Sequence, residues 1–314
     1  MIRALVLGIV QGLTEFLPIS SSAHLSIVPR LLGYPTPTLA FEVLLHFGTL
    51  AAVVAYFARD LWAFVLCLLA PGRLGPQEAG TRRRLLGLLV LASVPAAVVG
   101  FLVQDWADAQ TSRPLRASVW LVATTAIMIA AELYARSRAQ HPAEVTVPGD
   151  HSQIEPPGAA ARPTVVPGGR GAAPGGPTPD GLPAEEELKR LPVAKAAGIG
   201  LAQALALVPG TSRSGITISA GLFQGVSREA AARFSFLLSI PAILGAGILK
   251  LDELSGATET SAELVAGTLA AAVSGFVAVS FLLRLLRTRT LWPFIWYRLV
   301  AGGLFVLLLA TVRS

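Results

Sequence analysis

Residues 209–215 read Pro209-Gly-Thr-Ser-Arg-Ser-Gly215, and they end an apolar segment, Ala196–Val208, that is too short to cross a membrane. A similar stretch, Pro18-Ile-Ser-Ser-Ser-Ala-His24, follows a second short apolar segment, Ala4–Leu13. At 1.5 Å per residue each apolar segment reaches roughly 15–20 Å, about half of a bilayer's hydrocarbon core. Another short apolar piece follows each polar stretch. The pattern predicts two re-entrant helical hairpins whose polar breaks are buried within the protein.

Longer apolar segments predict helices that span the membrane, because a span needs roughly 20 apolar residues. The predicted spans are Leu39–Phe57, Leu85–Val103, Ala117–Tyr134, Phe234–Leu249, Leu264–Leu283 and Leu291–Val312. Of the 314 residues, 53% are hydrophobic and only 14% are charged, against roughly 25% charged in soluble domains. The single cysteine, Cys67, excludes an internal disulfide. The predicted fold class is therefore an all-α polytopic membrane protein.

The segment between Ser137 and Pro192 has a different composition, since half of the chain's 22 prolines fall there among glycines. Such a segment cannot bury enough apolar surface to offset the entropy of ordering it. We therefore expect a disordered linker over residues 137–192, between a first repeat, residues 1–136, and a second repeat, residues 193–314.

The two repeats share one plan, a re-entrant hairpin followed by three spans. The sequences also correspond: Pro18-x-Ser20-Ser21 matches Pro209-x-Thr211-Ser212. Three spans is an odd number, so the second repeat must start on the opposite side of the membrane. This predicts an inverted repeat in which the two polar breaks meet near the midplane.

The basic residues lie between apolar segments, so the net charge of +6 indicates membrane orientation and not a nucleic-acid partner. One set of loops is basic: Arg59, Arg73, Arg82, Arg83, Arg84, Arg136, Arg138, Lys189, Arg190, Lys195, Arg284, Arg287 and Arg289. A loop on the opposite side is acidic, with Asp252, Glu253, Glu259 and Glu263. The positive-inside rule predicts a cytoplasmic linker and two external termini.

The first polar break carries groups suited to phosphoanhydride hydrolysis. Gln11 and Glu15 are four residues apart and share one helix face. A serine such as Ser21 attacks phosphorus if a base removes its proton, and His24 is one helical turn further on. Glu15 could orient His24, act as the base, or hold a divalent cation. Ser20 and Ser22 add hydroxyl donors.

The second polar break is rich in donors for an oxyanion. Gly210 and Gly215 permit tight turns and close approach to a ligand. Arg213 presents a fork of donors that matches phosphate oxygens, although it could instead pair with Glu15. The remaining donors are the hydroxyls of Thr211, Ser212, Ser214 and Thr217.

Other polar residues in the spans have a simpler interpretation. Glu42 and His46 lie on one face of the first full span. Glu42 favours that helix's N-terminus, and His46 is as readily structural as functional. Glu132 ends a span near basic residues, which predicts an interfacial ion pair.

At these two motifs the chain resembles the undecaprenyl-diphosphate phosphatase family of the BacA/UppP type, known for bacitracin resistance. The family's first motif, Glu or Gln, three residues, then Glu, is present as Gln11 and Glu15. Its Pro-x-Ser-Ser-x-x-His stretch is present from Pro18 to His24. Its second motif, Pro-Gly-x-Ser-Arg-Ser-Gly-x-Thr, is present from Pro209 to Thr217.

The resemblance implies a hydrolase of the bacterial inner membrane that converts undecaprenyl diphosphate to undecaprenyl phosphate and inorganic phosphate, with a site open to the outer face. It also implies a divalent cation, Mg²⁺ or Ca²⁺. Carried over by motif, the catalytic residues would be Glu15, Ser21, His24, Ser212 and Arg213. The choice of nucleophile between Ser21 and His24 stays open, and we favour Ser21 because a hydroxyl beside a His–Glu pair has a route to activation.

A different class of function also fits the predicted architecture, because inverted repeats with broken helices build transporters and lipid flippases. A carrier for a phosphorylated lipid would need the anion donors but no nucleophile, so the set of Glu15, Ser21 and His24 favours chemistry. The oligomeric state stays open, with a homodimer as one option.

Overall fold

The computed structural model describes residues 1–111, 113–140 and 182–311. These residues form helices and no strand, and six helices are long and apolar enough to cross a membrane. The six are α3 (Leu39–Tyr56), α5 (Pro76–Thr111), α6 (Pro114–Gln140), α10 (Arg228–Leu249), α11 (Ser261–Leu286) and α12 (Trp292–Thr311). Each overlaps one predicted span, although α5 and α6 extend well beyond theirs, so the predicted fold class is confirmed.

Two pairs of shorter helices form the hairpins. In the first half α1 (Ile2–Phe16) precedes α2 (Ser21–Leu31), and in the second half α8 (Val193–Leu205) precedes α9 (Arg213–Phe223). The longest of them has 15 residues, which at 1.5 Å per residue is only about 22 Å. A core of about 30 Å is therefore not crossed by any of these helices alone.

The basic loop from Arg59 to Arg84 is more helical than the sequence suggested. It contains α4 (Ala58–Leu69), the short 3₁₀ turn η1 (Pro71–Arg73) and the first turns of α5. α4 forms because its Ala63, Phe64 and Cys67 share one buried face, which packs against α5.

The ends of the predicted linker are also helical. α6 continues to Gln140, since the residues after Tyr134 include no proline or glycine before Pro142. α7 (Ala184–Lys189) precedes α8 and buries Leu188. The remainder of the predicted linker, residues 141–181, lies outside the described residues. A further 3₁₀ turn, η2 (Leu251–Gly256), follows α10.

The hairpins pack against spans of the opposite half of the chain. α1 lies along α11, and α8 lies along α5. Glycines permit both contacts: a Cβ at Gly8 would lie 2.3 Å from the Gly267 carbonyl oxygen, and one at Gly200 would lie 2.4 Å from that of Ala92. These reciprocal pairings are consistent with an inverted repeat, which itself stays a prediction.

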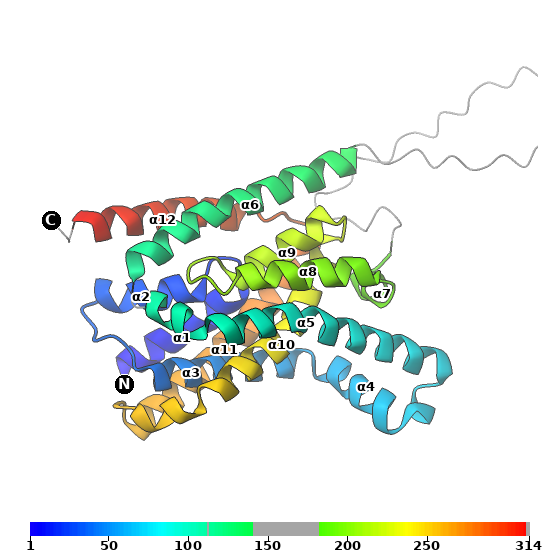
Figure 1. Ribbon diagram of the computed structural model, residues 1–314, viewed down its shortest axis with the longest axis horizontal. Coiled ribbons are helices and arrows are strands. Elements are labelled where there is room, and N and C mark those ends of the chain that lie inside the picture. Colours follow the sequence, from blue (N-terminus) through cyan, green and yellow to red (C-terminus); the bar gives the residue numbers. More distant parts are fainter. Residues whose placement is uncertain (112, 141–181, 312–314) are drawn as a thin grey trace, which may run out of the picture.

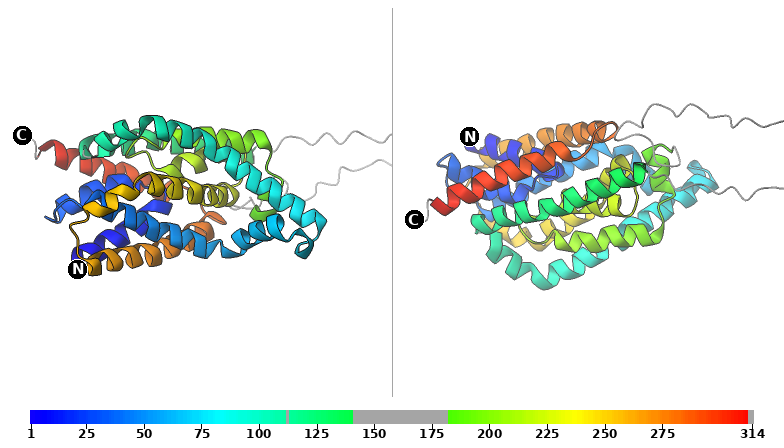
Figure 2. Two further views of the ribbon diagram at one scale, coloured as in Figure 1. Left: turned by 60° about the horizontal axis from the view of Figure 1, so that its bottom comes forward. Right: turned by 90° about the horizontal axis from the view of Figure 1, so that it is seen from above.

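The ends of the chain and the ends of the linker lie at opposite ends of the bundle (Figure 1). Both termini are at one end, and the end of α6 and the start of α7 are at the other, an arrangement that the two further views repeat (Figure 2). The acidic loop lies with the termini, because Arg3 pairs with Glu259 at 2.6 Å and the N-terminal amine pairs with Glu263 at 2.8 Å.

The glycine contact between α1 and α11 yields a prediction for stability. We expect Gly8→Leu to lower the free energy of unfolding by at least roughly 1–3 kcal/mol, because the side chain has no room without moving a helix. Gly245→Leu is the matched control, since nothing lies within 4 Å of a Cβ there. Thermal unfolding of both variants in detergent checks this, and equal melting temperatures would contradict it.

Candidate active site

Both polar breaks end in a serine with a left-handed backbone. Ser20 has φ 74° and Ser212 has φ 69°, and no other non-glycine residue in the described ranges has a positive φ. Such a conformation costs of order 1–3 kcal/mol and marks a place where the surrounding structure imposes it. Ser20 is the N-cap of α2, and Ser212 is the N-cap of α9.

The structure corrects the correspondence between the two breaks by one residue. The sequence comparison matched the prolines and so paired Ser20 with Thr211. The backbone instead pairs Ser20 with Ser212, and the hydroxyl of each lies 3.3 Å from that of the serine two residues later, Ser22 or Ser214. In this register Ser21 corresponds to Arg213, the first residue of each returning helix.

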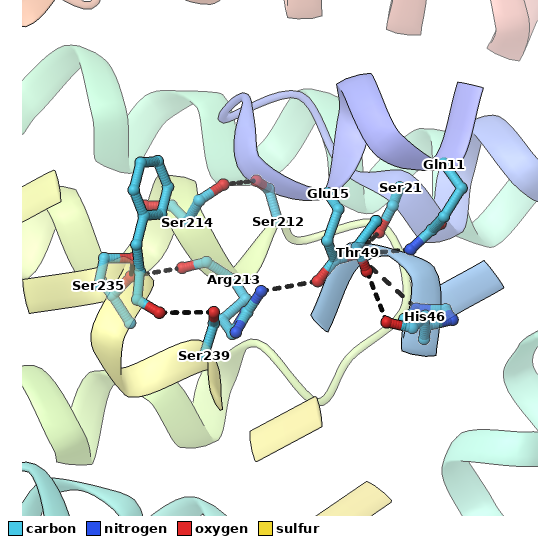
Figure 3. Close-up of polar contacts among 12 residues, drawn as sticks. Gln11, Glu15, Ser21, His46, Thr49, Ser212, Arg213, Ser214, Ser235 and Ser239 are labelled. Atoms are coloured by element: carbon cyan, nitrogen blue, oxygen red, sulfur yellow. Dashed lines mark hydrogen bonds and ion pairs between the residues drawn. The ribbon is translucent and has the colours of Figure 1, made fainter. Parts of the chain in front are cut away.

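One carboxylate joins the two breaks. Oε1 of Glu15 accepts a hydrogen bond from Nη2 of Arg213 at 2.6 Å, and Oε2 accepts one from Oγ of Ser21 at 2.6 Å (Figure 3). Gln11 Nε2 also donates to Oε2, at 3.1 Å. The ion pair is buried, with side-chain exposures of 8% for Glu15 and 15% for Arg213. The pairing of Arg213 with Glu15, considered from the sequence as an alternative, is therefore present.

Glu15, Ser21 and Arg213 line a pocket of about 680 Å³, whereas Gln11 is buried and does not line it. Its polar part includes Glu15, Ser20, Ser21, Ser22, Ser212 and Arg213. Two helix N-termini, those of α2 and α9, thus contribute to one pocket, and each favours an anion. The apolar part comes mainly from α3 and α10: Leu39, Val43, Phe47, Ala242, Ile243, Ala246 and Gly247. A pocket that has both anion-binding groups and apolar residues in its lining suits an amphiphilic ligand with an anionic head.

Unused hydrogen-bonding groups also point to a ligand. Nη1 of Arg213 and Oε1 of Gln11 are buried and have no hydrogen-bond partner. Buried polar atoms are nearly always paired, so each exception calls for an explanation. Nη1 of Arg213 is a charged donor beside the pocket, and an oxyanion would satisfy it.

His24 does not lie beside Ser21 as the sequence predicted. Its Nδ1 lies 2.7 Å from the Ser20 carbonyl oxygen, and its Nε2 lies 2.7 Å from the hydroxyl of Tyr297. Its ring stacks on Tyr297 and meets Phe305 edge to face. Both ring nitrogens are engaged and His24 does not line the pocket, because the turn of α2 points its side chain toward α12.

Six of the eight predicted substrate-binding residues do not line the pocket. Gln11 is one of them and bonds to Glu15, and the other five support the breaks. Gly210 has φ 99° and packs where a Cβ would lie 2.1 Å from the Ala117 carbonyl oxygen. Thr217 shares a hydrogen bond with Ser235 at 2.6 Å. The other three, Thr211, Ser214 and Gly215, are buried and contact neighbouring backbone or side chains.

His46 is a pocket residue to which the sequence reasoning gave no role. Its Nε2 lies 3.7 Å from Oε2 of Glu15, and its Nδ1 lies 2.8 Å from the Glu42 carbonyl oxygen. Glu42 lines the same pocket. The available signal was the spacing of these two residues, four apart on the first span, but a sequence does not reveal which face of a helix meets a cavity. Glu132 does form the predicted ion pair, with Arg228.

Oxygen donors suited to a hard divalent cation are present in the pocket. The described residues contain no group of three or more His, Cys, Asp or Glu side chains that could hold a metal by themselves. Mg²⁺ is commonly held by one or two carboxylates together with substrate phosphates. The Glu15 carboxylate lines the pocket and fits that mode of binding. The unpartnered Oε1 of Gln11 belongs to a buried side chain that bonds to Glu15 but does not line the pocket.

Known proteins resemble this chain along nearly its whole length. An undecaprenyl-diphosphatase of Pelotomaculum thermopropionicum is 39% identical, over 99% of this chain and 97% of its own. One of Alcanivorax borkumensis is 42% identical over 96% of both chains, and one of Geobacter sulfurreducens is 40% identical over 96% of this chain and 95% of its own. Residues 4–304 match the family described as "Bacitracin resistance protein BacA". With both motifs at one pocket and a family match that spans both halves of the chain, the chain belongs to the BacA bacitracin resistance protein family.

Proposed function

We propose that this protein hydrolyses undecaprenyl diphosphate to undecaprenyl phosphate and inorganic phosphate. The activity named for its relatives supports this, and so does a pocket lined by both anion-binding groups and apolar residues. The observation that carries the proposal is the Glu15 carboxylate, which binds the Ser21 hydroxyl and the Arg213 guanidinium at once. A base, a hydroxyl and a phosphate-binding cation are thereby held together. The transport alternative gains no support from these relatives.

In the proposed first step Glu15 takes the proton of Ser21 as its Oγ attacks the terminal phosphorus. The Oγ–P bond forms, the anhydride P–O bond breaks, and its electron pair leaves on undecaprenyl phosphate. In the second step water displaces Oγ from phosphorus, and Glu15 returns its proton to Ser21. The proton lost by water stays on the released phosphate. His24 takes no part, because both of its ring nitrogens are bound elsewhere.

The remaining groups bind and neutralise charge. Arg213 keeps Nη2 on Glu15, and its unpartnered Nη1 binds an oxygen of the transferred phosphoryl group. The N-termini of α2 and α9 face the same charge. Glu15 would hold Mg²⁺ or Ca²⁺ together with the phosphate oxygens of the substrate, and the cation would supply further neutralisation of the diphosphate when bound.

We further propose that the site opens to the outer face of the bacterial inner membrane. The pocket extends to Arg30, Thr36 and Lys250. Thr38, two residues after Thr36, donates to Glu259 at 2.6 Å, in the acidic loop that lies with the termini. By the positive-inside rule this end is external and the linker is cytoplasmic.

The function is tested by phosphate release from a C55 diphosphate by the detergent-purified protein, with and without a chelator. We expect release that stops when the chelator is added and returns with excess Mg²⁺ or Ca²⁺. Activity that a chelator leaves unchanged would remove the cation from the proposal, and no release under any cation would overturn the proposed function.

For Ser21→Ala we expect kcat to fall by at least about 10³-fold, because the attacking atom is lost. Ser26→Ala is the matched control, since Ser26 lines the same pocket but donates to the Ala23 carbonyl oxygen. Rapid quenching followed by mass spectrometry should find phosphate on Ser21. Near-normal turnover by Ser21→Ala, or phosphate trapped on His24, would reject this assignment.

For Arg213→Lys we expect kcat/KM to fall by about 10²–10³-fold, because a single ammonium cannot bind Glu15 and a phosphoryl oxygen as a fork does. Arg233→Lys is the control, because Arg233 pairs with Glu229 within α10 and does not line the pocket. Steady-state kinetics on both variants decides, and unchanged kinetics for Arg213→Lys would exclude Arg213 from the site.

A further inference from the structure

A fully buried arginine, Arg298 on α12, lies behind both polar breaks. Burying a charge without an opposite charge is unfavourable inside a membrane, so such a residue is expected to have a function. In the described part of the chain no carboxylate lies within ion-pair distance of Arg298. Its hydrogen bonds go to neutral oxygens only.

The guanidinium contacts the backbone of both breaks. Nη1 of Arg298 donates to the carbonyl oxygens of Pro18 and Thr211, each at 3.3 Å. Nη2 donates to the Thr211 oxygen as well, at 3.3 Å. Pro18 is two residues before Ser20, and Thr211 is directly before Ser212. The Arg298 guanidinium therefore holds the backbone just before each of the two serines that have a positive φ.

The orientation of this guanidinium is set by α6. Nε donates to Oγ1 of Thr125 at 2.8 Å, and Nη2 donates to the Leu121 carbonyl oxygen at 2.8 Å and to the hydroxyl of Thr124. α6 is one of the long spans, and it packs along α12. A rigid pair of helices thus carries the donors that reach both breaks.

Among the hydrogen bonds of the described residues, those of Arg298 alone join one side chain to carbonyl oxygens of both breaks. Without the hydrogen bonds of Arg298, each break could relax, because a serine with a positive φ costs of order 1–3 kcal/mol. Ser21 and Arg213 directly follow these strained serines, so relaxation would move both donors relative to Glu15.

We propose that Arg298 is a positioning residue for the reaction: its guanidinium fixes the two breaks relative to each other, so that Ser21 and Arg213 meet the same Glu15 carboxylate. Arg298 itself touches no substrate, since it does not line the pocket. This role rests on the proposed phosphatase activity, and it adds α12 to a site otherwise built by the two hairpins, α3 and α10.

The test compares Arg298→Lys with the wild type in phosphate release. Lysine keeps the charge but cannot reach both carbonyl oxygens and Thr125 together. We expect kcat to fall by about 10²-fold, the effect of a misplacement of about 1 Å, while KM changes by less than about threefold. Arg228→Lys is the matched control, because Arg228 is a part-buried arginine that pairs with Glu132 away from the pocket. It should alter stability and leave kcat per folded molecule unchanged.

Two further variants separate positioning from a loss of folding. Thr125→Val removes the partner of Nε and should lower kcat in the same direction, less severely, whereas Ser118→Ala on the same helix, whose hydroxyl bonds only to Pro114, should not. In a double variant of Arg298→Lys and Arg213→Lys, the fold-loss in kcat should be smaller than the product of the two single fold-losses. The reason is that both changes disturb the same contact, the one between residue 213 and Glu15. Multiplicative losses, or a normal kcat for Arg298→Lys, would overturn the proposal.

Hydrogen exchange supplies a readout that does not depend on activity. Peptides covering residues 17–24 and 208–216 should both exchange faster in Arg298→Lys than in the wild type. Faster exchange in only one of the two peptides would refute the proposal that Arg298 holds both breaks. If the wild type released no phosphate, the proposed function would fail. Faster exchange of both peptides in Arg298→Lys would still support the contact of Arg298 with both breaks.

Discussion

The carboxylate of Glu15 is the contact on which the site depends. It is held inside the bundle by a guanidinium from the other half of the chain, 198 residues away in sequence, and by a hydroxyl from its own hairpin. A carboxylate at this depth is tolerated only when paired. The pairing therefore has two consequences: it compensates the buried charge of Glu15, and it brings the two breaks into register.

The breaks themselves require support that ordinary helices do not. Each interrupts the backbone hydrogen bonding inside a membrane, and each contains a serine in the left-handed region. Cross-links between the breaks offset this: Ser22 accepts from the Gly210 amide at 3.0 Å, and Ser214 donates to the Leu17 carbonyl oxygen at 3.2 Å. Close helix contacts at Gly8 and Gly200 hold α1 and α8 against their partner spans. The reactive groups thus lie on irregular backbone, and rigid spanning helices surround that backbone.

Composition and motifs predict much of the site. The wrong predictions concern where the side chains of two histidines lie, and they share one cause. Gln11 and Glu15 do contact each other, and Arg213 does reach Glu15. His24 was placed beside Ser21 by helical spacing, yet its ring turns toward Tyr297 on the last span. The sequence assigns His46 no role in the site, yet it lies beside Glu15. Spacing along a helix reports which residues share a face, but it does not report what that face meets.

By itself the sequence determined the six spans, the two half-length hairpins and the residue types at the breaks, because the length of an apolar run and the position of a proline are local properties. Only the tertiary structure decided the one-residue register that pairs Ser20 with Ser212, the carboxylate that Ser21 and Arg213 share, and the burial of Arg298 behind them. The physical reason is that these contacts form between segments far apart in the chain. Their geometry is set by helix packing and by the need to satisfy every buried polar group, and neither can be evaluated one segment at a time.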